Sequence, residues 1–435
     1  MEYIVRFAQT HETFRRPELE ALATLWNIEL KIVTYSEDSP FCVVRLPSDD
    51  VARKLVSRAI LVDSVYELWG SGPNYEALHA DVKAKSQGKW DKYTTTSFRF
   101  NVHGYQCKLT NKEQRPIIES FSYLPFDGPI KMKDADVQFW VFEEYEMYAP
   151  SPKFLYFSRF IGPGGRDTVL KYDLKKRRYI STTSMDAELA LITANIALAR
   201  PGGLFYDPFM GTGGFPIACA HFGAMTTGSD IDARSIRGKP NRNVLSNYAQ
   251  YDLTDYWLDW FISDLTNTPL RISRFLDGIV CDPPYGVREG LKVLGRKDGG
   301  GTEAVYINGV AAHLQEGFIP PKRAYSFDAM LDDILDFAAQ TLVDRGRLAI
   351  WMPTANEDIE LAIPEHQCLK LVANCIQMFN KWSRRLLTYE RLPDELVGEL
   401  IPRTKRIVEG SNADELNNFR RKYFEGFKPS TPSEK

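Results

Sequence analysis

An apolar run that stops abruptly at an acid constrains the fold of this chain more than any other feature. Residues Leu276 to Cys281 are followed at once by Asp282, Pro283, Pro284 and Tyr285. Two prolines end a strand, because proline fixes φ and has no N–H to donate to a ladder. The pattern predicts a buried strand whose carboxyl end carries Asp282. In open α/β sheets, ligands bind beyond that edge.

The tetrapeptide from Asp282 to Tyr285 suits an exocyclic amine on a planar base. The Asp282 carboxylate and the carbonyls of Asp282 and Pro283 would accept both amine protons, which favours a pyramidal nitrogen able to attack an electrophilic methyl group. Tyr285 offers a ring for stacking. We therefore predict catalytic roles for Asp282, Pro283, Pro284 and Tyr285. The alternative is an ordinary turn, in which Asp and Pro are common.

A glycine-rich loop upstream favours the catalytic interpretation. The apolar stretch Leu204 to Tyr206 runs into Asp207-Pro208-Phe209, and glycines at 211, 213 and 214 permit a tight turn close to a ligand. A dinucleotide-binding loop would need a third glycine at 216, where this chain has Pro. An acid opening the loop suits the cationic amino-acid end of S-adenosyl-L-methionine. We expect that cofactor to contact a set of residues around this loop: Thr182, Thr183, Ser184, Asp207, Pro208, Phe209, Gly211 and Gly213.

Further acids follow the next expected strands. Asp230, with Asp232 as the alternative, follows the strand 224–229 and is expected to accept hydrogen bonds from ribose hydroxyls. Asp264, with Leu265 beside it, follows the strand 257–263 and is expected to meet the adenine amine. Each acid alone is more often a helix cap or a turn residue. Acids at three successive strand ends, with Asp282 at the fourth, favour one ligand site.

The composition allows two or three domains in 435 residues and gives a formal net charge of -3, so nucleic-acid contacts must come from local basic patches. The six cysteines show no Cys-x-x-Cys pair and no metal-ligand spacing, so no metal is expected. The sequence shows no signal peptide and no apolar run long enough for a membrane span. We therefore expect a cytoplasmic protein with reduced thiols.

Substrate contacts are expected on both sides of the predicted catalytic domain. Lys171 to Arg178 is the densest basic run of the chain, and either a solvated face or a phosphate contact explains it. Residues 380–385 add charge and one aromatic ring between two late strands, whose short connection requires an antiparallel pair. The predicted substrate-binding residues are Arg177, Arg178, Arg288, Lys381, Trp382 and Arg384.

With these residues in view, the chain resembles the catalytic subunits of eukaryotic tRNA (guanine-10-N2)-methyltransferases. The shared motifs begin at Phe14, Thr182, Asp207, Gly228, Cys281, Trp351 and Asn380. Met210 departs from the small residue common in related loops. The resemblance implies transfer of one methyl group to the N2 amine of guanosine 10 in tRNA, and a small zinc-binding activator protein as partner.

The resemblance also implies a fold. We expect an α/β chain in which a Rossmann-like methyltransferase domain, with a mostly parallel seven-stranded sheet and an antiparallel last strand, follows an α+β region containing a THUMP domain. The expected parts are an N-terminal ferredoxin-like domain (1–70), the THUMP domain (71–162), a linker (163–180), the methyltransferase domain (181–395) and a C-terminal tail (396–435). Within the catalytic domain, the long polar segment 286–323 with Gly299-Gly300-Gly301 predicts a substrate lid or partial disorder.

The expected third strand of the catalytic sheet lies at an edge and is unusually aromatic, from Tyr256 to Ile262. The activator protein is expected to add a strand there, unless loops of the chain itself cover the strand. Two other functions stay open from the residues: a DNA amino-methyltransferase, which shares the tetrapeptide, and a non-catalytic RNA-binding subunit with a relic cofactor pocket.

Overall fold

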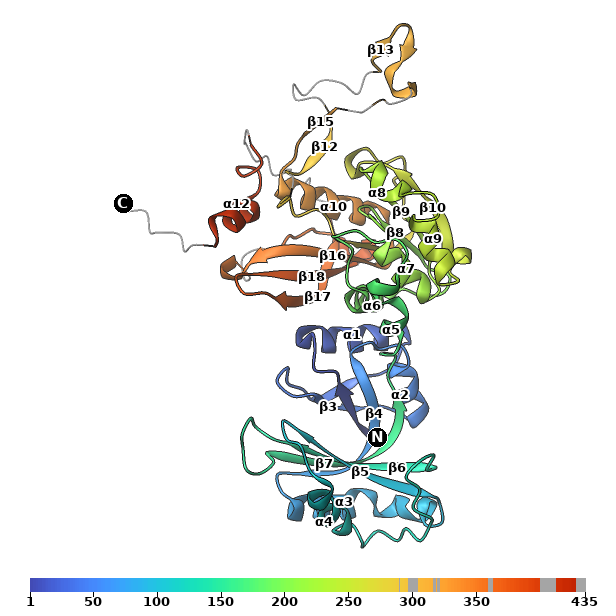
Figure 1. Ribbon diagram of the computed structural model, residues 1–435, viewed down its shortest axis with the longest axis vertical. Helices are drawn as coiled ribbons and strands as arrows, with labels where there is room; N and C mark the ends of the chain where they lie inside the picture. The colour runs from blue at the N-terminus through green and yellow to red at the C-terminus, as the bar shows by residue number, and fades with distance from the viewer. Residues whose placement is uncertain are drawn as a thin grey trace, which may run out of the picture. The chain divides into compact units, whose positions relative to one another are not determined.

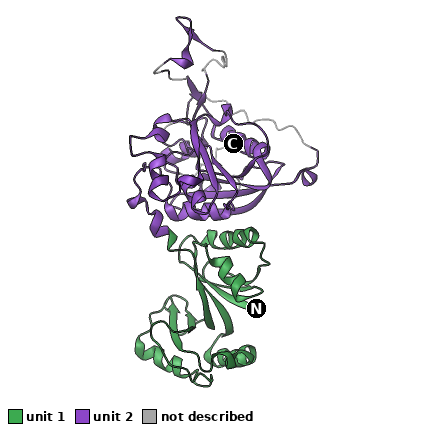
Figure 2. Ribbon diagram, turned by 90° about the vertical axis from the view of Figure 1, so that its right-hand side faces the viewer, with its two compact units in different colours: residues 1–168 green, residues 169–435 purple. Residues whose placement is uncertain are grey.

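The computed structural model in Figure 1 describes residues 1–288, 290–295, 304–315, 318, 321–358, 363–399 and 412–427. The chain forms two compact units, residues 1–168 and 169–435 (Figure 2). Within the described residues, no helix is both long enough and apolar enough to cross a membrane.

Unit 1 is built on one seven-stranded sheet. Its strands, in spatial order, are β2 (Lys31–Thr34), β3 (Phe41–Arg45), β1 (Glu2–Phe7), β4 (Val62–Gly72), β7 (Phe154–Pro163), β6 (Val137–Glu144) and β5 (Phe98–Tyr105). Its α-helices are α1 (Glu12–Leu25), α2 (Asp49–Val56), α3 (Tyr75–Ser86) and α4 (Asn111–Glu119). The unit is therefore an α+β structure, as the sequence predicted.

Strand β4 belongs to both halves of this sheet, because it pairs antiparallel with β1 on one side and with β7 on the other. Its side chains also serve two hydrophobic clusters. Tyr66 belongs to one cluster with Ile4 and Phe41, whereas Trp69 belongs to the other with Leu78 and Val82. The expected boundary near residue 70 therefore falls within a strand that both expected domains share. The domain bounds themselves stay a prediction.

Unit 2 carries a second seven-stranded sheet. Its spatial order is β10 (Trp257–Ile262), β9 (Met225–Asp230), β8 (Leu204–Asp207), β11 (Leu276–Cys281), β16 (Leu342–Ala355), β18 (Trp382–Arg391) and β17 (Leu369–Met378). The pairs from β10 to β16 are parallel, and β18 runs antiparallel to both of its neighbours. The expected mostly parallel sheet with an antiparallel last strand is confirmed.

Helices follow the strands of this sheet in the order of a doubly wound fold. They are α5 (Thr168–Tyr172), α6 (Ala187–Ile196), α7 (Gly214–His221), α8 (Ala233–Arg237), α9 (Val244–Gln250) and α10 (Phe327–Thr341). Asp186 caps α6, because its carboxylate accepts hydrogen bonds from the amides of Glu188 and Leu189. Carboxylates are good caps because they satisfy helix N–H groups.

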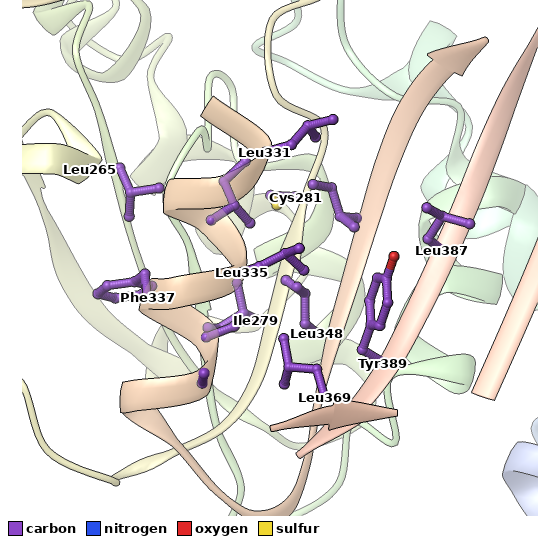
Figure 3. Packing of buried hydrophobic residues seen from close by; sticks show 14 of the residues in the cluster. Leu265, Ile279, Cys281, Leu331, Leu335, Phe337, Leu348, Leu369, Leu387 and Tyr389 are labelled. Atoms are coloured by element: carbon purple, nitrogen blue, oxygen red, sulfur yellow. The ribbon is translucent and has the colours of Figure 1, made fainter. Parts of the chain in front are cut away.

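The core beside the site lies between α10 and the sheet (Figure 3). Leu331 and Leu335 of α10 belong to the same buried cluster as Ile279 of β11 and Leu348 of β16. Full burial of each such side chain stabilises the fold by roughly 1.5 to 3 kcal/mol. Cys281 is fully buried and belongs to this cluster.

Two segments extend this domain. After β11, β12 (Lys292–Leu294) pairs with β15 (Lys322–Ala324), and β13 (Tyr306–Ile307) pairs with β14 (Val310–Ala311). The glycines at 299–301 lie outside the described residues. The helix α11 (Asp394–Val397) spans the expected start of the tail at residue 396, and α12 (Asn418–Glu425) lies within the tail (Figure 1). Residues 400–411 and 428–435 lie outside the described residues.

Candidate active site

A cavity of about 970 Å³ opens in unit 2 where β8, β9, β10 and β11 end. Most of the predicted site residues line it: Thr183, Ser184, Asp207, Pro208, Phe209, Gly211, Asp230, Asp232, Asp264, Leu265, Asp282, Pro283, Pro284, Tyr285, Arg288, Trp382 and Arg384. Thr182, Gly213, Arg177, Arg178 and Lys381 lie outside its lining. The structure therefore brings the loop after Asp207 and the loop after Cys281 to one hollow. Parallel strands place their carboxyl ends at one edge of a sheet, which explains the gathering.

The loop after β8 is a tight turn into α7. The Asp207 side chain accepts a hydrogen bond from the Phe209 amide at 2.9 Å and is almost fully buried. Gly213 has φ 81°, a left-handed conformation that favours glycine, and a Cβ there would lie 2.9 Å from Val244 Cγ1. Burial raises the pKa of Asp207, and the charges of Asp230 and Asp282 raise it further.

Met210, the departure from related loops, is buried beneath this turn. Its amide donates to the Ser229 carbonyl at 3.0 Å, which ties the loop to β9. Its side chain packs over Gly228, where an added Cβ would lie 2.7 Å from the Met210 sulfur. Gly228 in β9 therefore makes the room that the larger side chain needs.

Asp230 and Asp232 differ in their surroundings. The Asp230 carboxylate accepts from the amides of Gly211 at 3.0 Å and Asp232 at 2.8 Å, so it couples the ends of β8 and β9. Burial raises the pKa of Asp230. Asp232 caps α8 and forms an ion pair with the exposed Arg234 at 3.0 Å, which lowers the pKa of Asp232. Asp230 is thus the inner acid of the two.

Both carboxylate oxygens of Asp264 accept hydrogen bonds from backbone amides. Its Oδ1 accepts from Thr266 at 3.0 Å, and its Oδ2 accepts from Leu294 of β12 at 2.6 Å. The carboxylate therefore fastens the insertion after β11 to the end of β10. Each oxygen keeps a further lone pair for a ligand.

Asp282 presents an unused acceptor to the cavity. Its Oδ1 is buried and has no partner in hydrogen-bond geometry within the described part of the chain, and the same holds for the Tyr285 hydroxyl, although the two groups lie close together. Buried polar atoms in native proteins usually have partners, so such atoms point to a ligand. Burial raises the pKa of Asp282 to about 6, and the nearby Tyr285 and Arg384 partly offset that rise.

Arg384 brings a fixed positive charge to this acid. Its Nε and Nη2 donate to Gln377 Oε1 at 3.0 and 2.6 Å, which holds the guanidinium between two strands. The same group lies 5.3 Å from the centre of the Trp351 ring, a cation–π distance. Arg384 is therefore oriented before any ligand arrives.

The residues outside the lining have other contacts. Thr182 Oγ1 accepts from Arg288 Nη1 at 2.6 Å, so it holds a residue that does line the cavity. Arg177 is 6% exposed and lies 5.9 Å from the Tyr251 ring centre, whereas Arg178 is exposed. Lys381 Nζ donates to the Gly426 carbonyl at 3.0 Å. The sequence-predicted roles of these residues stay predictions.

The aromatic lining residues that sequence reasoning missed include Phe419 and Tyr423 of α12. The sequence predicts a polar tail with a short helix from Asp414 to Tyr423 in this segment, but not that the helix reaches the cavity. The signal was present in the i, i+4 spacing of the two rings and in Asn417, a good N-cap residue. Among the described residues, no group of three His, Cys, Asp or Glu side chains is placed to hold a metal ion.

Comparisons with known proteins support both units. A family model described as "Tmrp11 THUMP N-terminal domain" matches residues 1–166, and one described as "RMKL-like, methyltransferase domain" matches residues 175–296. The expected THUMP region and methyltransferase domain are confirmed.

Curated relatives match over nearly the whole chain. A tRNA (guanine(10)-N(2))-methyltransferase of Saccharomyces cerevisiae is 42% identical over 441 residues, which cover 98% of this chain and 99% of the relative. The corresponding protein of Schizosaccharomyces pombe is 37% identical, with 97% and 96% covered. That of Homo sapiens is 34% identical, with 98% and 95% covered. The chain belongs to the tRNA (guanine(10)-N(2))-methyltransferase family.

Proposed function

We propose that this chain transfers a methyl group from S-adenosyl-L-methionine to the N2 amine of guanosine 10 in tRNA. The single observation that carries the proposal is the buried, unpartnered Oδ1 of Asp282 in a cavity shared with the glycine-rich loop after Asp207. The names of the relatives supply the substrate, and the site supplies the chemistry.

The residues of the cavity fit a cationic cofactor. Asp207, Asp230 and Asp282 lie close enough to raise the pKa of Asp207, so a bound positive charge would relieve their repulsion. Asp207 and the glycine turn would hold the amino-acid end, Asp230 the ribose, and Asp264 with Leu265 the adenine. Thr183 and Ser184 line the same cavity, and Ser184 is fixed by a contact of 2.8 Å with the Thr212 hydroxyl. When bound, the sulfonium supplies the electrophilic methyl group.

Asp282 would orient and deprotonate the amine. Its free oxygen and the Pro283 carbonyl accept the two amine protons, and Tyr285 packs against the guanine. The cofactor would supply the methyl group and keep the electron pair of its C–S bond as a neutral thioether, so that a C–N bond replaces the C–S bond. Asp282 would take the surplus N–H proton and then release it to water. Positioning accounts for most of the rate enhancement in such a direct transfer. A guanosine within a stem must first be flipped out, at a cost of a few kcal/mol.

Unit 1 would grip the tRNA, since its family model is that of a THUMP domain. Arg288, Trp382 and Arg384 line the cavity and would contact the substrate near the reacting base. Arg178 and Lys381 would bind flanking phosphates, whose contacts dominate affinity for nucleic acids. Arg177 is buried, so it would support tRNA binding indirectly, by holding the backbone of the basic run from Lys171 to Arg178 in place.

The small zinc-binding activator would dock at β10. This strand lies at the sheet edge, and within the described residues it pairs with β9 alone. Leu258 and Ile262 are 47% and 42% exposed. Asp259 has φ 81° and interrupts the register with β9, so the regular stretch from Trp260 to Ile262 is where a strand would add.

The decisive experiment is nucleoside mass spectrometry of tRNA incubated with the chain and S-adenosyl-L-methionine, with and without the activator. We expect one N2-methylguanosine per tRNA, lost when guanosine 10 is replaced by adenosine. Methylation of duplex DNA instead of tRNA would show the DNA amino-methyltransferase. Absence of cofactor binding by calorimetry would show the non-catalytic RNA-binding subunit.

A further inference from the structure

The segment 412–427 lies beyond both family-model matches and beyond the expected end of the catalytic domain at residue 395. Its helix α12 nevertheless contributes Phe419 and Tyr423 to the lining of the cavity. We infer that this segment is a working part of the active site, in which Asn417 and Arg420 are positioning residues for the loop that carries Asp282 and Tyr285. This inference rests on the proposed function.

The loop after Asp282 takes hydrogen bonds from this segment in three successive residues. Asn417 Nδ2 donates to the Tyr285 carbonyl at 2.9 Å. Arg420 Nη1 donates to the Val287 carbonyl at 3.0 Å and also to the Gly286 carbonyl. Two prolines precede these carbonyls, so the loop leaves the sheet and its ladder at once. Side chains of the C-terminal segment therefore donate hydrogen bonds to loop carbonyls that no neighbouring strand reaches.

The loop after Asp282 and the segment 412–427 pack closely at Gly286. Gly286 has φ 75°, and an added Cβ would lie 2.7 Å from Asn417 Nδ2. Asn417 is 3% exposed, and its Oδ1 accepts from the Arg420 amide at 3.0 Å. One side chain therefore caps α12 and holds the loop, which couples the start of the helix to the position of Tyr285.

The far end of α12 is fastened to a different part of the catalytic domain. Lys422 Nζ contacts Glu357 Oε1 at 2.6 Å and Asp358 Oδ2 at 2.8 Å, just beyond β16. Lys381, in the turn between β17 and β18, donates to the Gly426 carbonyl. The helix thus reaches from the Asp282 loop to the end of β16 and the start of β18, the strand that carries Trp382 and Arg384.

Aromatic rings complete this wall of the cavity. The Trp382 ring lies 5.7 Å from Phe419, 6.4 Å from Tyr423 and 6.5 Å from Tyr285, centre to centre. All four residues line the cavity. Flat apolar faces are what a flipped nucleobase stacks on. α12 therefore supplies part of the surface against which the target base, or its neighbour, would pack.

The test compares two adjacent arginines of α12 under one substitution in the full chain. Arg420→Gln removes the charged donor to the loop, whereas Arg421→Gln changes an exposed side chain that contacts only the helix's own Asn418 within the described residues. Asn417→Asp serves as the second variant, because it keeps the oxygen that caps α12 and loses the donor to Tyr285. The readouts are kcat and KM for tRNA, cofactor affinity by calorimetry, and hydrogen exchange of the amides from 285 to 288.

We expect Arg420→Gln and Asn417→Asp to lower kcat by about tenfold to a hundredfold, the scale of small misplacements in active sites. Cofactor affinity should stay within about twofold of wild type, because the cofactor residues lie on the other loops. Exchange of the loop amides should become faster in both variants and stay unchanged in Arg421→Gln. Equal exchange and equal kcat in all three variants would overturn the inference. If the wild type methylated no tRNA, the proposed function would fail, and the exchange comparison would still decide whether the segment holds the loop.

Discussion

Asp207 and Asp282 stand at the same edge of the sheet on the neighbouring parallel strands β8 and β11, and the charge of Asp282 helps to raise the pKa of Asp207. Repulsion between the two carboxylates favours either a proton on one of them or a cation beside them. The pair therefore marks the point at which a positively charged methyl donor and an amine acceptor would meet.

Replacing Asp282 should separate binding from chemistry. Asp282→Asn keeps the size of the side chain but turns one acceptor oxygen into a donor, so the side chain accepts the amine less well and can no longer take up its proton. We expect methyl transfer to fall by at least about a thousandfold, the combined scale of lost positioning and proton transfer. Affinities for tRNA and cofactor should change little. Titration calorimetry and single-turnover kinetics would check this, and loss of both affinities would show a structural role instead.

Activity should rise with pH around the pKa of Asp282. Burial raises that pKa to about 6, so the carboxylate is ionised and able to accept above pH 6 and is protonated below it. We expect kcat/KM to increase through a midpoint near 6 and to level off above pH 7. Arg384 lowers this pKa, so Arg384→Gln should move the midpoint upward. If the midpoint did not move in that variant, a group other than Asp282 would control the rise of kcat/KM with pH.

The raised pKa of Asp282 also lowers the free energy of unfolding at neutral pH. In the unfolded chain Asp282 ionises near pH 4, and in the folded chain near pH 6. The folded state thus binds more protons between these values, and its stability falls as pH rises through them. Asp282→Asn should raise the free energy of unfolding at pH 7.5 by up to about 3 kcal/mol and have little effect at pH 4. Denaturant unfolding at both pH values would check the sign, and a destabilised variant at pH 7.5 would contradict it.

The turn after Asp207 allows a matched test of cofactor binding. Gly213→Ala places a Cβ at φ 81° within 2.9 Å of Val244, whereas Gly202→Ala meets a similar φ of 78° with nothing within 4 Å. Both should lose about 1 kcal/mol or more of stability, because L residues are strained there. Only Gly213→Ala should also weaken cofactor affinity, measured by calorimetry. Equal affinities in the two variants would show that the turn does not shape the site.

Sequence patterns predicted the parts of the site that depend on local chemistry. An apolar strand followed by an acid is a local signal, and Asp207, Asp230, Asp264 and Asp282 all reach one cavity because parallel strands end together. The edge position of β10 and the antiparallel β18 followed from connection lengths and the expected fold.

What the sequence did not reveal depends on contacts between distant segments. Asn417 and Tyr285 are far apart in the chain, and a polar tail gives no local sign of the surface on which it packs. The shared strand β4 was missed for a similar reason, since its eleven residues read as the end of one domain and the start of another. Periodicity reports which face of an element is buried, not which element covers it.

The edge strand gives a prediction about the partner. Leu258 and Ile262 of β10 are half-exposed apolar side chains at one edge of the sheet, and Val372 of β17 is a comparable side chain at the opposite edge. Lysine at an edge strand disfavours strand addition, because its charge would have to be buried. We expect Ile262→Lys to abolish co-purification with the activator protein and Val372→Lys to leave it intact. Size-exclusion chromatography with light scattering would measure both, and loss of the complex in Val372→Lys alone would move the docking surface to β17.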